Sequence, residues 1–182
     1  MNDFRHILRT ATRPHHERVD ARFSRFDIRE RDGYAGFLQA QLGGHLGVAS
    51  ALQGMESDFD LGPRIAAIRA DLRVLGASEP MAIPTPFRPK QALGFIYVIA
   101  GSLHGVNVLR RVWSTSTDHR VLSASNFMDY SDLNAQWARL LGMFNATSFS
   151  AADQARIISA AQAAFDIFER AASAVRPEAI EA

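Results

Sequence analysis

Apolar residues recur every three or four positions along most of the chain, which is the spacing of one face of an α-helix. β-hairpin signals are absent from the sequence, and no repeat of fixed period is present. The pattern therefore predicts an all-α protein of six to eight helices. The stretches with this period cover residues 4–26, 34–52, 60–75, 90–113, 127–130, 132–144 and 150–172.

Helix-breaking and helix-capping residues set the limits of these stretches. Pro14 interrupts the first stretch and predicts a kink or a break there. Gly76 is suited to end the third helix, and Ser150 to cap the start of the last. Residues 90–113 are apolar on nearly every side, so we expect this helix to be central. Residues 114–125 are polar and predict a loop. An extended connector is predicted where four prolines cluster, at Pro80, Pro84, Pro86 and Pro89.

Composition places this pattern in a single globular domain, residues 1–182. The chain is 47% apolar, which is enough to bury a sizeable core. The absence of cysteine excludes disulfides, thiolate-bound metals and cysteine nucleophiles. A net charge of +1 argues against a general nucleic-acid binder. No run reaches the roughly 18 apolar residues of a membrane helix, and the N-terminus lacks the apolar region of a secretion signal. We therefore expect a cytoplasmic protein with no membrane partner.

Six histidines are the first candidates for chemistry, and two of them are adjacent. His15 and His16 can both face the apolar side of the first helix, so helical periodicity does not choose between them. A partly buried structural histidine is the alternative interpretation of either residue. The sequence lacks the motifs of dinuclear metal sites, zinc proteases, phosphate-binding loops and serine hydrolases.

The stretch Gly101-Ser102-Leu103-His104-Gly105 is the second candidate for chemistry. A glycine in a helix interior costs about 1 kcal/mol relative to alanine, and two glycines four residues apart face the same side. Some group must therefore approach that side of the backbone closely. Three explanations are open at this point: a tightly packed neighbouring helix, a flat ligand, or a bend in the helix.

Together, the first and fourth predicted helices resemble those of heme oxygenase. Residues 8–16 resemble that family's Leu-x-x-Ala-Thr-x-x-x-His signature, and residues 97–109 resemble its distal helix in the form common among bacterial members. The similarity spans nearly the whole chain and implies an all-α, heme oxygenase-like bundle. Its other segments are residues 31–34, Phe127-x-x-Tyr130, Trp137 and residues 164–169.

The resemblance implies roles for particular residues. His16, the last residue of the signature, would be the proximal ligand of the heme iron. Gly101 and Gly105 would let the distal helix pass close above the porphyrin. Arg9 and Arg139 would pair with the heme propionates, although either arginine can equally be a solvated surface charge.

The sequence departs from the family pattern after the first distal glycine, where many members have Asp and this chain has Ser102. A hydroxyl can hold a water but supplies no carboxylate for proton delivery. His104 has three interpretations: a proton relay, a sixth iron ligand that blocks O₂, or a side chain bonded away from the iron.

The implied activity is cleavage of heme, which is substrate and cofactor at once, to biliverdin, carbon monoxide and ferrous iron. Electrons would come from a separate donor, a ferredoxin or a flavin reductase, because no flavin or nicotinamide motif is visible. The biliverdin fits either iron acquisition or chromophore supply to a phytochrome. One alternative is a heme-binding sensor or carrier of the same fold without turnover. Another is a heme-free relative of the thiamine-degrading branch, which relies on a cysteine that this chain lacks.

Overall fold

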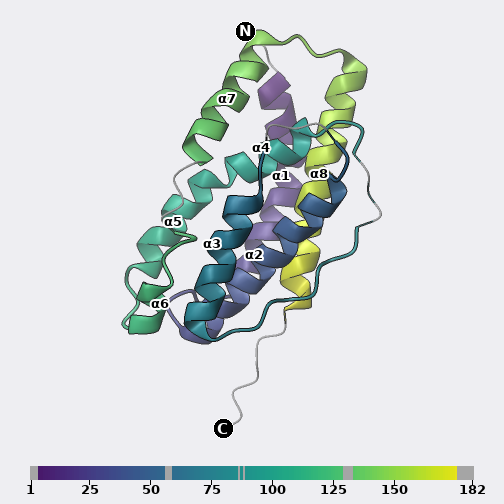
Figure 1. Cartoon of the computed structure of the whole chain (residues 1–182). Helices are drawn as coiled ribbons and strands as arrows, with labels where there is room; N and C mark the ends of the chain where they lie inside the picture. The colour runs from purple at the N-terminus through teal and green to yellow at the C-terminus, as the bar shows by residue number, and fades with distance from the viewer. Residues whose placement is uncertain (1–3, 56–58, 86, 88, 129–132, 176–182) are drawn as a thin grey trace.

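The described part of the chain, residues 4–55, 59–85, 87, 89–128 and 133–175 of a computed structural model, is all α-helical. It contains eight helices and no β-strand, which confirms the fold class that the apolar period predicts (Figure 1). The helices are α1 (Phe4–Phe23), α2 (Arg31–Ala51), α3 (Gly62–Leu75), α4 (Leu93–Gly101), α5 (Leu103–Trp113), α6 (His119–Ser123), α7 (Leu133–Ala146) and α8 (Ala151–Ala174).

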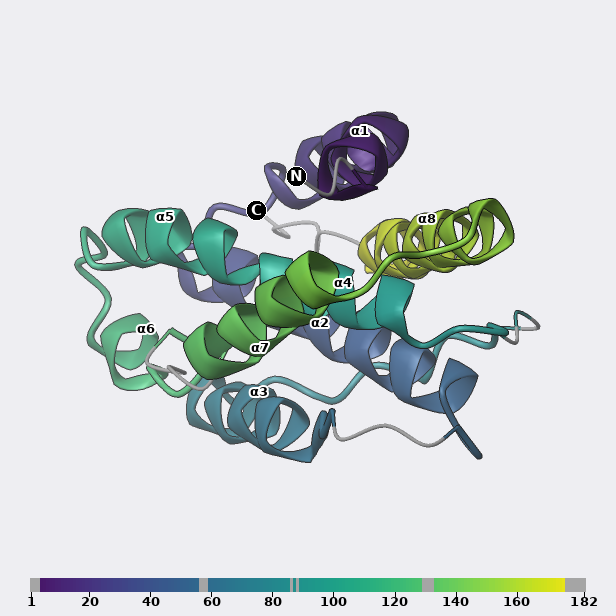
Figure 2. The same cartoon turned by 90° about the horizontal axis from the view of Figure 1, so that it is seen from above.

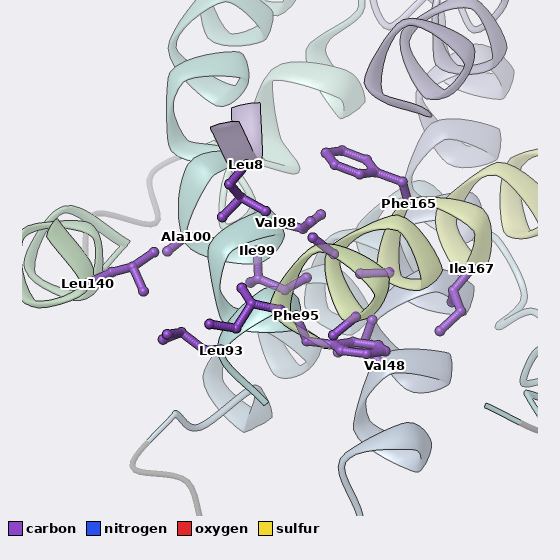
Figure 3. Close-up of a cluster of buried hydrophobic side chains, with 14 of the residues drawn as sticks. Leu8, Val48, Leu93, Phe95, Val98, Ile99, Ala100, Leu140, Phe165 and Ile167 are labelled. Atoms are coloured by element: carbon purple, nitrogen blue, oxygen red, sulfur yellow. The ribbon is translucent and has the colours of Figure 1, made fainter. Parts of the chain in front are cut away.

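Helix α8 is the element against which the others assemble. It packs along α1, α2 and α4, while α3 packs on α2 (Figures 1 and 2). Burial of apolar surface drives this assembly. Figure 3 shows side chains from α1, α2, α4, α7 and α8 meeting in one cluster, among them Leu8, Val48, Phe95, Val98, Ile99, Leu140, Phe165 and Ile167.

A second buried cluster joins α2 and α3 to the segment that follows α6. Asp71 of α3 is fully buried and accepts hydrogen bonds from the backbone N–H groups of Asn126 at 3.0 Å and Phe127 at 2.7 Å. Arg64 donates to the Phe127 carbonyl at 2.9 Å and lies over the Phe127 ring. These charge-assisted bonds offset the cost of burying the two side chains and fix the segment on α3.

The helix predicted over residues 90–113 is interrupted in the structure. α4 ends at Gly101, and Ser102 separates it from α5. The Ser102 hydroxyl donates to the carbonyl of Ile99 at 2.7 Å, and its backbone N–H is shared between the carbonyls of Val98 and Ile99. A serine bonded back to the preceding turn beside a glycine distorts a helix. A departure from regular helix is thus one reason for a glycine here.

The predicted loop over residues 114–125 is wrong at its centre, which forms the short helix α6. The Asp118 carboxylate caps this helix by accepting from the N–H of Arg120 at 2.7 Å. An aspartate before a short apolar stretch is a helix-start signal that the sequence contained. Pro14, in contrast, does not break α1, which continues to Phe23. One proline removes a single backbone donor, and its fixed φ is compatible with a helix.

The short helix predicted over residues 127–130 is not a helix where the structure describes it. Residues 126–128 form a turn, and residues 129–130 lie outside the described residues. The side chains of Phe127 and Met128 are buried in the second cluster. Tertiary anchoring on Asp71 and Arg64 therefore decides the backbone of this segment.

The stretch Leu93–Trp113, taken as one helix, is long and apolar enough to cross a membrane by length and composition, with a mean hydropathy of 1.3. The sequence criterion required an unbroken run of about 18 apolar residues. This stretch does not meet that criterion because it contains polar residues. Buried core helices of soluble proteins pass the same test, and 44% of this stretch is buried inside the molecule. The stretch is therefore weak support for a membrane span.

Ser150→Ala is expected to destabilise the protein by about 1 kcal/mol. The Ser150 hydroxyl accepts from the N–H of Asp153 at 3.2 Å and donates to its carboxylate at 2.7 Å, which confirms the predicted N-cap of α8. Chemical denaturation measures the change in free energy of unfolding. Ser148→Ala, at a nearby exposed position, is the control and should change it by less than about 0.5 kcal/mol. Equal losses in both variants would contradict a contribution from the cap.

Candidate functional site

One stripe of α1 contains three residues spaced to lie on the same side of the helix, Arg9, Thr12 and His16. Tyr97 of α4 borders this stripe, since its hydroxyl is hydrogen-bonded to the side chain of Thr12 and it lies in the field of Arg9. Burial raises the pKa of Tyr97, while Arg9 and Thr12 act in the opposite direction. The stripe therefore faces α4 at Thr12, while His16, one turn further along, lies against Phe165 of α8.

His16 is exposed and its ring orientation is fixed by neighbours. Its side chain is 59% exposed, its Nδ1 lies 3.0 Å from Oδ2 of Asp20, and its ring packs edge-on against Phe165 with centroids 5.5 Å apart. A carboxylate can only accept a hydrogen bond, so Nδ1 carries the proton in the neutral ring. The lone pair of Nε2 is then available to a ligand.

His15 points into a different environment, the seam between α1 and α8. Its side chain is 21% exposed, and its Nδ1 lies 2.9 Å from both Oδ1 of Asp166 and Nη2 of Arg18. Arg18 also donates to Glu169 at 2.9 Å, and this carboxylate raises the pKa of Arg18. His15 thus belongs to a network that links the two helices.

The two glycines of the fourth predicted helix have different neighbours. A Cβ on Gly101 would lie 3.5 Å from the ring of Trp137 on α7, which is an ordinary packing distance, so this neighbour does not by itself require a glycine. A Cβ on Gly105 would meet no described atom within 4 Å. No neighbouring helix in the described structure explains Gly105, which leaves the flat ligand among the explanations for that position.

The exposed side of α5 is apolar next to Gly105. Val108 is 61% exposed and Val112 is 43% exposed, and both lie on the same side of the helix as Gly105. An exposed apolar stripe marks a candidate contact surface for a ligand or a partner. Sequence reasoning missed both valines, although their spacing of three and seven residues from Gly105 was a readable signal. It also missed Asp20, four residues after His16.

Ser102 and His104, the two polar residues between the glycines, are exposed and lie at the junction of α4 and α5. The Ser102 hydroxyl donates to the backbone carbonyl of Ile99 in α4. The His104 ring packs edge-on against Trp137, with centroids 5.6 Å apart. Both side chains are therefore oriented partly by contacts within the protein.

The two predicted propionate partners are both solvent-exposed. Arg9 lies on the His16 stripe of α1, and Arg139 lies on α7 two residues after Trp137. Neither forms an ion pair with another residue of the described parts of the chain. Both remain cations that a ligand carboxylate can approach.

Other hollows and clusters lie apart from these residues. An open depression is bordered by none of the predicted site residues; its lining is Thr85, Phe87, Ala163, Asp166, Glu169 and Arg170. Within residues 4–55, 59–85, 87, 89–128 and 133–175, no group of three or more histidines and carboxylates is arranged to hold a metal ion. Iron held in a porphyrin needs far less, since one axial histidine suffices.

Comparison with known proteins gives a partial similarity. The chain is 35% identical over 107 residues to a protein named heme oxygenase from Xanthomonas campestris pv. campestris (strain 8004). This chain is similar to a heme oxygenase. The similarity covers 58% of this chain and 64% of that heme oxygenase. No protein-family model matches the chain.

Proposed function

We propose that this protein binds heme between α1 and α5 and cleaves it, with O₂ and an external reductant, to biliverdin, carbon monoxide and ferrous iron. His16 carries the proposal, because its ring is exposed, its Nδ1 is bonded to Asp20 and its Nε2 is left for a ligand. The similarity to a heme oxygenase supports heme degradation in general.

The histidine and its carboxylate fit the needs of an iron ligand. A metal-binding histidine almost always donates its second ring N–H to a carboxylate or carbonyl, which fixes its tautomer. Asp20, one turn along the same helix, provides this acceptor for His16. His15 fits less well because its Nδ1 is engaged by Asp166 and Arg18, and turning its ring away would break the α1–α8 network.

The exposed side of α5 fits a flat apolar ring. A ring lying on a helix needs backbone without a protruding side chain, which Gly105 provides, and apolar contact beside it, which Val108 and Val112 provide. Arg9, on the His16 stripe, is a cation suited to a propionate of the same ligand, and Arg139 is a second candidate.

Heme, when bound, supplies both the iron that holds O₂ and the ring that is cleaved. The chain's own part includes proton delivery, and neither α4 nor α5 contains a carboxylate for it. The Ser102 hydroxyl proton is directed to the Ile99 carbonyl, so its oxygen can accept from a water but its proton is engaged. His104 is exposed, and an imidazole ring has one nitrogen that can donate a proton and one that can accept it, which makes His104 the candidate relay.

The proposal includes an electron donor, a cellular location and a use for the product. Electrons would be delivered by a ferredoxin or a flavin reductase, and the protein would act in the cytoplasm. Its biliverdin would serve either iron release or chromophore supply to a phytochrome.

Mixing the protein with hemin is expected to give the absorption spectrum of a histidine-bound heme, which reductant and O₂ then convert to that of biliverdin. His16→Ala is expected to lose the histidine-bound spectrum and to weaken hemin binding about tenfold or more, since the axial bond is removed. His6→Ala, an exposed histidine of the same helix, is the matched control and should leave the spectrum and the affinity unchanged.

Gly105→Leu separates the ligand site from folding. The new side chain starts in open space, so the free energy of unfolding should not fall, whereas the ring would collide with it and hemin binding should be lost. Unchanged hemin binding by Gly105→Leu, with an unchanged spectrum for His16→Ala, would refute the proposed site.

A heme sensor or carrier without turnover is the second candidate, and Ser102 favours it because no carboxylate stands at that position. The same experiment separates the two functions. A stable histidine-bound heme that is never converted to biliverdin would support the carrier. Failure to bind hemin at all would favour a heme-free relative.

A further inference from the structure

Trp137 of α7 covers one stretch of the α4–α5 pair. Its indole lies 3.5 Å from the Cβ position of Gly101, and its ring centroid lies 6.0 Å from that of Tyr97 and 5.6 Å from that of His104. Tyr97, Gly101 and His104 are four and three residues apart, so they form one continuous stripe. A single indole therefore covers this stripe where α4 meets α5.

The uncovered face of α5 begins immediately beyond the indole. Gly105 is the next residue along this side, and no described atom lies within 4 Å of its Cβ position. Val108 and Val112 continue the exposed face toward the end of α5. α7 packs along α4 (Figures 1 and 2), so the boundary between covered and uncovered helix lies between Gly101 and Gly105.

Aromatic packing holds Trp137 in place. Its ring is tilted against Tyr97, whose own ring packs edge-on against Phe144 at 6.2 Å between centroids. Phe144 in turn packs edge-on against Phe4 of α1 at 5.8 Å. Such pairs resist rearrangement, and an indole has few torsions of its own. Trp137 thus forms a fixed wall at one end of the exposed face.

We infer that Trp137 is a specificity-determining residue: it limits how far a flat ring can slide along α5 toward α4, and so selects which edge of the ring lies over Gly105. The inference rests on the proposed heme site. Heme has unlike edges, and the bridging carbon that is cleaved depends on how the ring is placed in its plane. A wall against one edge discriminates between placements by steric exclusion.

Two measurements on the hemin complex test this, one of them independent of turnover. The heme-methyl NMR resonances of the cyanide-bound ferric protein report the in-plane placement, and chromatography of the products reports the biliverdin isomers. Trp137→Ala is expected to change the ratio of placements and of isomers about tenfold or more, measured at saturating hemin. Trp137→Phe, which keeps part of the wall, is expected to give an intermediate change. Met143→Ala, an exposed residue of α7, is the control and should change neither ratio.

The outcomes separate this inference from the proposed function. Wild-type protein that binds no hemin would overturn both. Wild-type protein that binds hemin, with placement and isomer ratios unchanged in Trp137→Ala, would overturn the role of Trp137 alone. If Trp137→Ala does not fold, as judged by circular dichroism, an unchanged ratio in Trp137→Phe overturns the role.

Discussion

Gly94→Ala is expected to destabilise the protein by about 3 kcal/mol or more, the upper part of the range for overpacking a core. Gly94 lies where α4 crosses α8. A Cβ there would overlap the backbone carbonyl of Ile157 and lie 2.6 Å from the backbone nitrogen of Ala161. Backbone atoms cannot rotate away, so the two helices must separate. The roughly 1 kcal/mol of helix propensity that alanine gains does not offset this cost.

Thermal and urea unfolding measure this loss, and Gly142→Ala provides the matched control. Gly142 is also a glycine inside a helix, but a Cβ on it would meet no described atom within 4 Å. That variant should be neutral or stabilised by up to about 1 kcal/mol. Equal stability of the Gly94 and Gly142 variants would contradict the close crossing of α4 and α8.

The free energy of unfolding of wild-type protein is expected to fall in acid because of His45, and His45→Leu is expected to abolish this part of the decrease. Burial lowers the pKa of His45 to about 3, and the charge of Arg64 acts in the same direction. In the unfolded chain the ring protonates near pH 6.5. Between about pH 6.5 and 3 the unfolded state therefore binds more protons than the folded state, so stability falls as the pH falls. From pH 7 to pH 4 this amounts to about 3 kcal/mol.

The measurement is the free energy of unfolding against pH for both proteins. The carboxylates are common to wild type and variant, so the difference between the two curves isolates His45. Leucine loses the 2.7 Å hydrogen bond between Nδ1 and the Gln41 carbonyl, but it also removes Nε2, which is buried without a hydrogen bond to any described residue. These two changes oppose each other, so the variant should be within about 1 kcal/mol of wild type at pH 7. Parallel curves between pH 7 and pH 4 would contradict the buried, neutral histidine.

Local pattern was sufficient for most of the secondary structure, because a helix face and its caps depend on neighbours in sequence. The period of apolar residues predicted an all-α chain, and Ser150 marked the start of α8 correctly. The errors arose where tertiary contacts or side-chain bonds override the pattern. Ser102 bonds back to Ile99 and interrupts the central helix, and Phe127 is held in a turn by distant charged residues on α3.

The candidate site was only partly predictable, since its residues come from four helices, α1, α4, α5 and α7. Residue type and spacing pointed to Gly105 and left His15 and His16 as alternatives, while the family resemblance selected His16 and Arg9. These three residues remain the basis of the proposed heme site. Trp137 covers Gly101, although the two residues are 36 positions apart and lie on different helices. Spacing within one segment of the sequence cannot predict such a contact.

By itself, the sequence determined the fold class, the absence of thiol chemistry and the candidate histidines and glycines, because these depend on composition and on periods of a few residues. Only the tertiary structure decided the surroundings of the two histidines. His15 joins the network between α1 and α8, whereas His16 lies beside the Asp20 carboxylate and keeps one ring nitrogen for a ligand. The tertiary structure also distinguished two helical glycines by their surroundings: Gly94 is closely packed on α8, whereas Gly105 faces open space. The physical reason is that burial and close approach are properties of pairs of segments, and a single segment does not specify its partner.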